Sequence, residues 1–156
     1  MTEINGYASH LPVLSRLLLA TSQSYQVLEY GSGHYSTPLI QSRVHGESIE
    51  PGDWYEQLKN YYPNIHQGSP KHSKYGLILV DSAPAETRLE FIEKYWTFSD
   101  VWILHDSCHS HLYGYDLIDK FKYSYEYEQL TPHTRILTQQ PLLKQIVTEL
   151  NLTVGE

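Results

Sequence analysis

The 156-residue sequence lacks the features of three classes of protein: those stabilised by disulfides, those that bind nucleic acid through phosphate, and those that span a membrane. Its single cysteine, Cys108, excludes an internal disulfide. It has 11 basic and 18 acidic side chains, a formal charge of −7, and no cluster of basic residues, so phosphate-driven binding of nucleic acid is not expected. It has no secretory signal, and no apolar run approaches the roughly 18 residues of a membrane-spanning helix. We therefore expect a cytoplasmic protein that binds neither nucleic acid nor membranes.

The length predicts a single domain over residues 1–156. The stretch 27–37, VLEYGSGHYST, predicts a short buried strand, a tight turn and the start of a helix. Gly31 and Gly33 have no Cβ and let a ligand approach the backbone, and Ser32 lies between them. The first N–H groups of a helix have no partner inside it, which favours an anionic ligand group there. We expect a small ligand to lie on this turn.

Two acidic residues narrow down the chemistry of that ligand. Glu29 precedes the first glycine by two positions, where a carboxylate repels the pyrophosphate of a dinucleotide and attracts a cation. S-adenosyl-L-methionine is a cationic ligand without phosphate. Glu50 closes a second strand-like run, 46–50, at about the offset where doubly wound folds place a ribose-binding carboxylate. Glu50 is therefore expected to bind ribose hydroxyls.

These motifs together carry a family resemblance. The runs VLEYGSGHYST, SIEPGDWYEQL, YGLILVDSAPAETR and DVWILHDS resemble the class I S-adenosylmethionine-dependent methyltransferases, over roughly residues 6–139. The resemblance implies an α/β, Rossmann-like, doubly wound sheet that is mostly parallel, with an antiparallel pair of strands at its C-terminal end. It also implies that Glu29 lies near the methionine end of the cofactor, that Gly31 and Gly33 line its methionine and ribose part, and that Glu50 binds the ribose. The sequence departs from many members at Ser36, where they have a third glycine.

Two further residues are candidates for the adenine end of the cofactor. Trp54 begins a predicted helix, 54–61, and is expected either to stack near the adenine or to be buried against the sheet. Gly68 ends a predicted third strand, 64–68, where this fold usually meets the adenine. With Ser32, these residues complete the predicted cofactor set.

A second group of polar residues follows two apolar runs. Asp81 ends the continuously apolar run 76–80, which is typical of a central parallel strand, and His105 and Asp106 follow the run 100–104. Because ligands bind beyond the carboxyl ends of such strands, Asp81 should lie on the same rim as the cofactor and contribute to its binding. Asp81, His105 and Asp106 are our candidates for catalysis, and His109 and His111 are further candidate ligands or bases.

Several oxygen-directed methyltransferases hold a divalent ion between carboxylates at these two strand ends. The resemblance therefore makes Asp81 and Asp106 a candidate site for a metal such as Mg²⁺, which would lower the pKa of a substrate hydroxyl. Two alternatives need no metal. Asp81 can form an ion pair with Arg88, in the helix predicted over 85–95, and Asp106 can cap the helix that follows it.

The flanking segments are predicted as follows. Before the first strand, Ser9 is expected to cap a helix and to leave His10 exposed; alternatively, Tyr7 and His10 touch cofactor or substrate. Aromatic residues alternate with polar ones over 121–128, which predicts a strand paired with 134–138. That aromatic stripe is expected in the core, or alternatively in the seam of a homo-oligomer. A last helix is expected from Pro141.

The sequence thus predicts an S-adenosylmethionine-dependent methyltransferase acting on a small-molecule acceptor, with oxygen the favoured atom. Residues 81–84, DSAP, replace the Asp-Pro-Pro-Tyr type motif of relatives that methylate amino groups of bases. The alternatives are a protein that binds or degrades S-adenosylmethionine without methyl transfer, an aminopropyl transferase, and an NAD-dependent oxidoreductase. Glu29 and Ser36 oppose the last of these.

Overall fold

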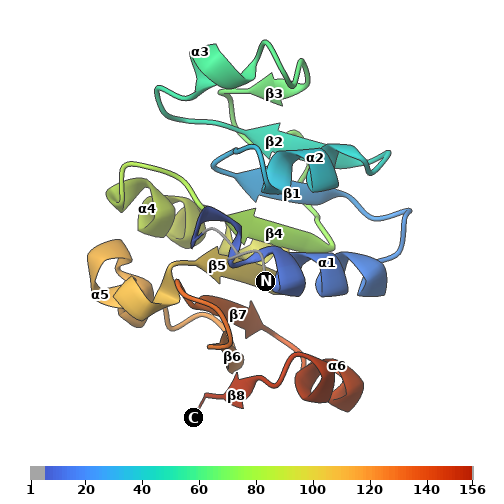
Figure 1. Ribbon diagram of the computed structural model, residues 1–156, viewed down its shortest axis with the longest axis vertical. Helices are drawn as coiled ribbons and strands as arrows, with labels where there is room; N and C mark the ends of the chain where they lie inside the picture. Colours follow the sequence, from blue (N-terminus) through green and yellow to red (C-terminus); the bar gives the residue numbers. More distant parts are fainter. Residues whose placement is uncertain (1–5, 156) are drawn as a thin grey trace.

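The computed structural model describes residues 6–155, and within them one eight-stranded mixed sheet. The strands stack in the order β3-β2-β1-β4-β5-β7-β6-β8, which Figure 1 shows from one edge of the sheet to the other. Strands β3, β2, β1, β4 and β5 are parallel, whereas β7, β6 and β8 each pair antiparallel with the preceding neighbour. Their bounds are β1 (Val27–Tyr30), β2 (Gly46–Ile49), β3 (Ile65–His66), β4 (Leu77–Val80), β5 (Val101–His105), β6 (Tyr123–Tyr127), β7 (Thr134–Thr138) and β8 (Thr153–Val154).

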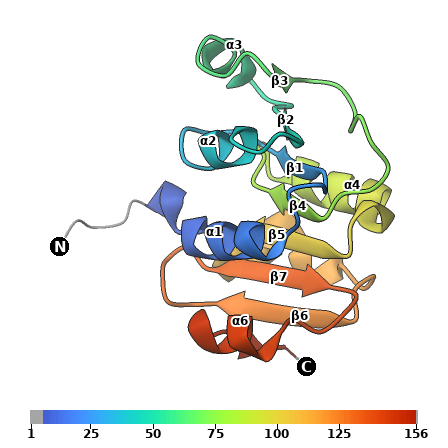
Figure 2. The same cartoon turned by 90° about the vertical axis from the view of Figure 1, so that its right-hand side faces the viewer.

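Helices cover both faces of this sheet. Figure 2 shows α1, α2 and α6 on the near side of the sheet, and α4 lies on the far side. The α-helices are α1 (Leu11–Ala20), α2 (Ser36–Gln41), α3 (Tyr55–Leu58), α4 (Glu86–Tyr95), α5 (Ser110–Tyr113) and α6 (Lys144–Glu149). Short 3₁₀ turns are η1 (Gly6–Ala8), η2 (Trp96–Phe98), η3 (Ser107–His109) and η4 (Tyr115–Leu117). No helix within residues 6–155 has the length and apolar character to cross a membrane.

The two faces of β4 show why its sequence is continuously apolar. Leu77 and Leu79 belong to the core cluster that contains the buried face of α1, whereas Ile78 and Val80 belong to the cluster around α4. Side chains alternate between faces along a strand, so a strand covered on both sides has no position for a polar residue before its end. Asp81 is the first residue beyond that cover.

The predicted antiparallel pair is confirmed, with two differences. Strands β6 and β7 pair as expected from their alternation, but the aromatic stripe is only partly core: Tyr125 and Tyr127 are buried, whereas Tyr123 is 39% exposed. The last helix begins at Lys144 and not at Pro141. The chain then adds strand β8 beside β6, which was not predicted because a strand of two residues has no recognisable sequence pattern. Helix α3 is also shorter than the predicted 54–61.

Candidate active site

The glycine turn after β1 is shaped by its packing against β4. Gly31 has a φ of +93°, and its N–H donates to the carbonyl of Ile49 at 2.8 Å. A Cβ at Gly31 would lie 2.4 Å from backbone atoms of Asp81 and Ser82, so this glycine is required by the fold itself. A Cβ at Gly33 would meet no atom of residues 6–155 within 4 Å, so the space beside Gly33 is open to a ligand.

Glu50 anchors the same turn from the end of β2. Its Oε2 accepts the N–H of Ser32 at 2.6 Å, and its Oε1 accepts the N–H of Gly52 at 3.0 Å. The residue is 3% exposed, and burial raises its pKa, although the two backbone hydrogen bonds oppose that rise. Each carboxylate oxygen can accept more than one hydrogen bond, so Glu50 can hold the turn and also bind ligand hydroxyls. Ser32 adds a buried hydroxyl that has no partner within residues 6–155.

Glu29 lies beneath the turn, in the interior of the sheet. It is fully buried, and the Thr37 hydroxyl donates to its Oε1. Among the described residues its Oε2 has no hydrogen-bond partner. Burial raises the pKa of Glu29 to about 7, against the lowering effect of the hydroxyls of Thr37, Ser36 and Ser48. Glu29 is therefore a desolvated carboxylate that no cation within the described part of the chain compensates.

The two residues predicted for the adenine end lie at the surface. Trp54 is 55% exposed on the loop between β2 and α3, which excludes the alternative that it is buried against the sheet. Gly68 is exposed just beyond β3, where its N–H donates to Nδ1 of His66 at 3.0 Å. An exposed indole at this position can stack on a planar ring.

Asp81 and Asp106 lie on either side of the guanidinium of Arg88. One nitrogen, Nη2, lies 3.0 Å from Oδ1 of Asp81 and 3.1 Å from Oδ2 of Asp106. The predicted ion pair of Asp81 with Arg88 is confirmed. A cation is thus already in place between the two carboxylates, so they do not fit the predicted Mg²⁺ site.

Arg88 is itself held rigidly in the interior. It is 5% exposed and donates to the carbonyl of Ser82 at 2.7 Å and to the carbonyl of His105 at 3.0 Å. Its guanidinium also donates to the Tyr115 hydroxyl at 3.0 Å and lies 3.9 Å above the ring of Tyr113. These contacts fix the position of the positive charge beneath both aspartates.

His105 has both ring nitrogens engaged. Nδ1 lies 3.0 Å from Oδ1 of Asp81, and Nε2 lies 3.0 Å from Oγ of Ser9. The Ser9 hydroxyl has one proton, which it donates to the carbonyl of Pro132 at 2.8 Å or of Gly6 at 3.0 Å, so it accepts from His105. Ser9, His105 and Asp81 therefore form a hydrogen-bonded chain that ends on backbone, and Ser9, with no exposed surface, is not a nucleophile.

The charges of this chain reinforce one another. Burial by itself lowers the pKa of His105, but the hydrogen bond and charge of Asp81 together raise it above its usual value. Burial by itself raises the pKa of Asp81, but His105 and Arg88 hold it below its usual value. Asp81 is the more accessible member, with 25% of its side chain exposed against 3% for His105.

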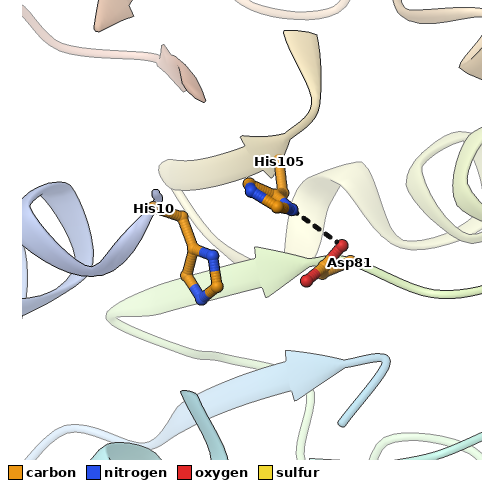
Figure 3. A group of neighbouring side chains, drawn as sticks. All are labelled: His10, Asp81 and His105. Carbon is orange, nitrogen blue, oxygen red and sulfur yellow. Dashed lines mark hydrogen bonds and ion pairs between the residues drawn. The ribbon is translucent and has the colours of Figure 1, made fainter. Parts of the chain in front are cut away.

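The exposure predicted for His10 from the sequence is wrong. It was expected to be exposed, yet it is 1% exposed, and its ring meets that of His105 edge-on with centroids 4.5 Å apart. Figure 3 shows His10 converging on Asp81 and His105 from the start of α1. Burial, with the nearby charge of His105, lowers the pKa of His10 to about 4. His109 and His111 are exposed and lie outside this cluster.

Comparisons with known proteins place this arrangement among known folds. No protein-family model matches the chain, and no curated protein matches it in sequence. The solved structure of the human methyltransferase 10 domain containing protein superposes with a TM-score of 0.50 over 88% of this chain and 84% of its own, at 16% identity. The chain has the class I methyltransferase fold. A putative precorrin-6Y C5,15-methyltransferase targeted domain from Corynebacterium diphtheriae superposes with a TM-score of 0.46 over 84% of this chain and 99% of its own, at 13% identity.

In this methyltransferase fold the two halves of the site share one rim. The N–H of Asp81 donates to the carbonyl of Tyr30 at 2.8 Å, so the glycine turn after β1 lies directly against the end of β4. Strand order reverses between β1 and β4, which is where open α/β sheets bind ligands. A cavity of about 500 Å³ opens at the amino ends of β1 and β2, among Gln26, His45 and Asn64, at the other end of these strands from the rim.

Proposed function

We propose that this chain is an S-adenosylmethionine-dependent methyltransferase that acts on an oxygen atom of a small-molecule acceptor. The observation that supports it best is the desolvated carboxylate of Glu29, which has no cationic partner among the residues that the structure describes and lies beneath a turn that is open at Gly33. A buried carboxylate of this kind favours a cationic ligand over a dinucleotide. The methyltransferase fold supports the same conclusion.

Each predicted cofactor residue has a role in this proposal. S-adenosylmethionine supplies an electrophilic methyl group on its sulfonium when bound. Glu50 accepts hydrogen bonds from the ribose hydroxyls, and Glu29 attracts the positively charged methionine end of the cofactor. Gly31, Ser32 and Gly33 form the floor of the site, and Trp54 stacks on the adenine near Gly68.

Asp81 is the residue that we assign to the acceptor. It is the accessible carboxylate at the switch point, so it can hold an acceptor hydroxyl and receive its proton. His105 has no free nitrogen to act as a base, and we assign it, with Arg88 and Asp106, to positioning Asp81. Holding the acceptor in line with the methyl group can contribute about 7–11 kcal/mol to catalysis in favourable systems.

Calorimetric titration of the purified chain tests this proposal. We expect micromolar binding of S-adenosylmethionine and S-adenosylhomocysteine and no binding of NAD. Glu50→Ala should weaken both adenosyl ligands by roughly one to two decades, because hydrogen bonds to a charged acceptor contribute about 1.5–3 kcal/mol. Glu93→Ala, which removes an exposed carboxylate from α4, is the matched control and should leave both affinities unchanged.

The same titration separates the alternatives. Binding of NAD alone, or of no nucleoside ligand, would refute the proposal. If the adenosyl ligands bind, a screen of hydroxylated acceptors with wild type and Asp81→Asn distinguishes an enzyme from a binding protein. In an enzyme the variant loses turnover while its cofactor affinity survives; in a sensor of S-adenosylmethionine there is no turnover to lose.

A further inference from the structure

The proposed methyl transfer leaves one feature of the rim without a role, namely the buried imidazole of His10. Neither of its nitrogens has a hydrogen-bond partner among the described residues, although the side chain is 1% exposed. A buried polar group without a partner destabilises a fold. Native proteins have few such groups, and a bound ion or water commonly satisfies them.

His10 lies against two other metal-ligating side chains. One ligand atom from each of His10, Asp81 and His105 lies within 4.8 Å of the others, and Figure 3 shows the three side chains facing one another. We propose that these three residues bind one divalent transition-metal ion through two imidazole nitrogens and one carboxylate oxygen. Two histidines and one carboxylate are a ligand set that proteins use for zinc and for non-haem iron.

The existing hydrogen bond between His105 and Asp81 already has the spacing of two ligands on one ion. Their facing atoms lie 3.0 Å apart, and two ligands about 2.1 Å from a metal lie about 3.0–3.4 Å apart. An ion takes the place of the proton that the two residues share in the metal-free chain. A shift of about 1.5 Å brings the widest pair in the cluster from 4.8 Å to ligand spacing.

The surroundings supply the outer partners that metal-binding side chains need. With Nδ1 of His105 on the ion, Nε2–H still donates to the Ser9 hydroxyl, which in turn donates to backbone. Such a donor bond fixes the ring of a ligating histidine. Arg88 remains on Asp81, so the ligating carboxylate is hydrogen-bonded as well.

The ligand chemistry selects among metals. Imidazole nitrogen suits Zn²⁺, Co²⁺ and Ni²⁺, whereas Mg²⁺ prefers an all-oxygen shell with several waters. Because Arg88 lies between Asp81 and Asp106, the ion lies on the His10 side of Asp81 and not between the carboxylates. An ion there would lower the pKa of a hydroxyl that it bound.

Titration of the untagged, chelator-treated chain with ZnCl₂ and CoCl₂ tests the site. We expect one ion per chain and visible absorption bands of protein-bound Co²⁺. The key variant is His10→Leu, which replaces the unpartnered ring by an apolar side chain of similar size. It should weaken binding at least about 100-fold by removing one of three ligands. The metal-free variant should melt at a higher temperature than the metal-free wild type, because the unpaired polar group is gone.

Two further variants make the test specific. Asp81→Asn should lose the ion as His10→Leu does. His72→Ala, in an exposed residue that lines the cavity at the amino ends of β1 and β2, should bind like wild type. No stoichiometric binding, equal binding by His10→Leu, or loss of the ion in His72→Ala would overturn the inference. These titrations contain no adenosyl ligand, so their outcome is independent of the cofactor measurement.

Discussion

Replacing Glu29 by glutamine should stabilise the free chain and at the same time weaken its proposed cofactor. The folded-state pKa of Glu29 is about 7, above the ordinary value of 4.5, so the folded chain binds this proton more tightly than the unfolded chain does. Its free energy of unfolding is therefore lowered as the pH rises from about 4.5 to about 7. A shift from 4.5 to about 7 corresponds to about 3 kcal/mol at pH 8, and to about 1 kcal/mol or less at pH 5.

Glutamine removes that pH-dependent penalty and keeps an oxygen to accept the Thr37 hydroxyl. Urea unfolding of wild type and Glu29→Gln at pH 5 and pH 8 measures the gain, with Glu93→Gln as the exposed control. We expect a gain of about 3 kcal/mol at pH 8 that shrinks to about 1 kcal/mol or less at pH 5. A gain of the same size at both pH values, or a loss at pH 8, would show that the carboxylate is not desolvated as argued. Weaker binding of S-adenosylmethionine by the more stable variant would show that Glu29 serves the ligand and not the fold.

The glycine turn and the arginine beneath the aspartates give two further predictions. Gly31→Ala should destabilise the chain severely, because its Cβ would lie 2.4 Å from backbone of Asp81. Gly33→Ala should change the free energy of unfolding by less than about 0.5 kcal/mol and weaken the binding of adenosyl ligands. Thermal unfolding and calorimetry check both, and a stable Gly31→Ala variant would contradict the geometry. Arg88→Met should lower the free energy of unfolding by about 3–5 kcal/mol at pH 7, because it leaves two partly buried carboxylates without their cation. Adding Asp106→Asn should recover part of that loss in urea unfolding, and strict additivity of the two changes would refute the shared ion pair.

The sheet could be predicted because its signals are local. The apolar runs before Asp81 and His105 and the alternation over 121–128 each depend on residues next to one another in the chain. The carboxyl ends of parallel strands meet at one edge, so the acidic residues that end them were correctly expected to share a rim. Element boundaries were less well predicted, since α2, α3 and α6 are short helices that depend on tertiary packing.

The interior of the cluster could not be predicted, because it joins residues that are distant in sequence. Nothing near Ser9 or His10 indicates that β5 will place His105 against them. The predicted metal pair failed for a related reason. The sequence predicts an ion pair of Asp81 with Arg88 as an alternative to the metal, but no pattern in it indicates that the same guanidinium also contacts Asp106. Whether a buried arginine excludes a metal from a pair of carboxylates can be predicted only when its distances to both carboxylates are known.

The two halves of the rim differ in how their carboxylates are compensated, and that difference supports the order of ligands along it. Asp81 and Asp106 share Arg88 as a built-in cation, so one of their two negative charges is compensated within the protein. Among residues 6–155, no cationic side chain lies against Glu29 or Glu50, and burial raises the pKa of both. A site that stays out of balance in the free protein binds most favourably the ligand that restores it. A sulfonium and an ammonium meet that condition at the glycine turn, whereas a neutral acceptor suits the half beside Asp81, where Arg88 and the proposed divalent ion supply the positive charge.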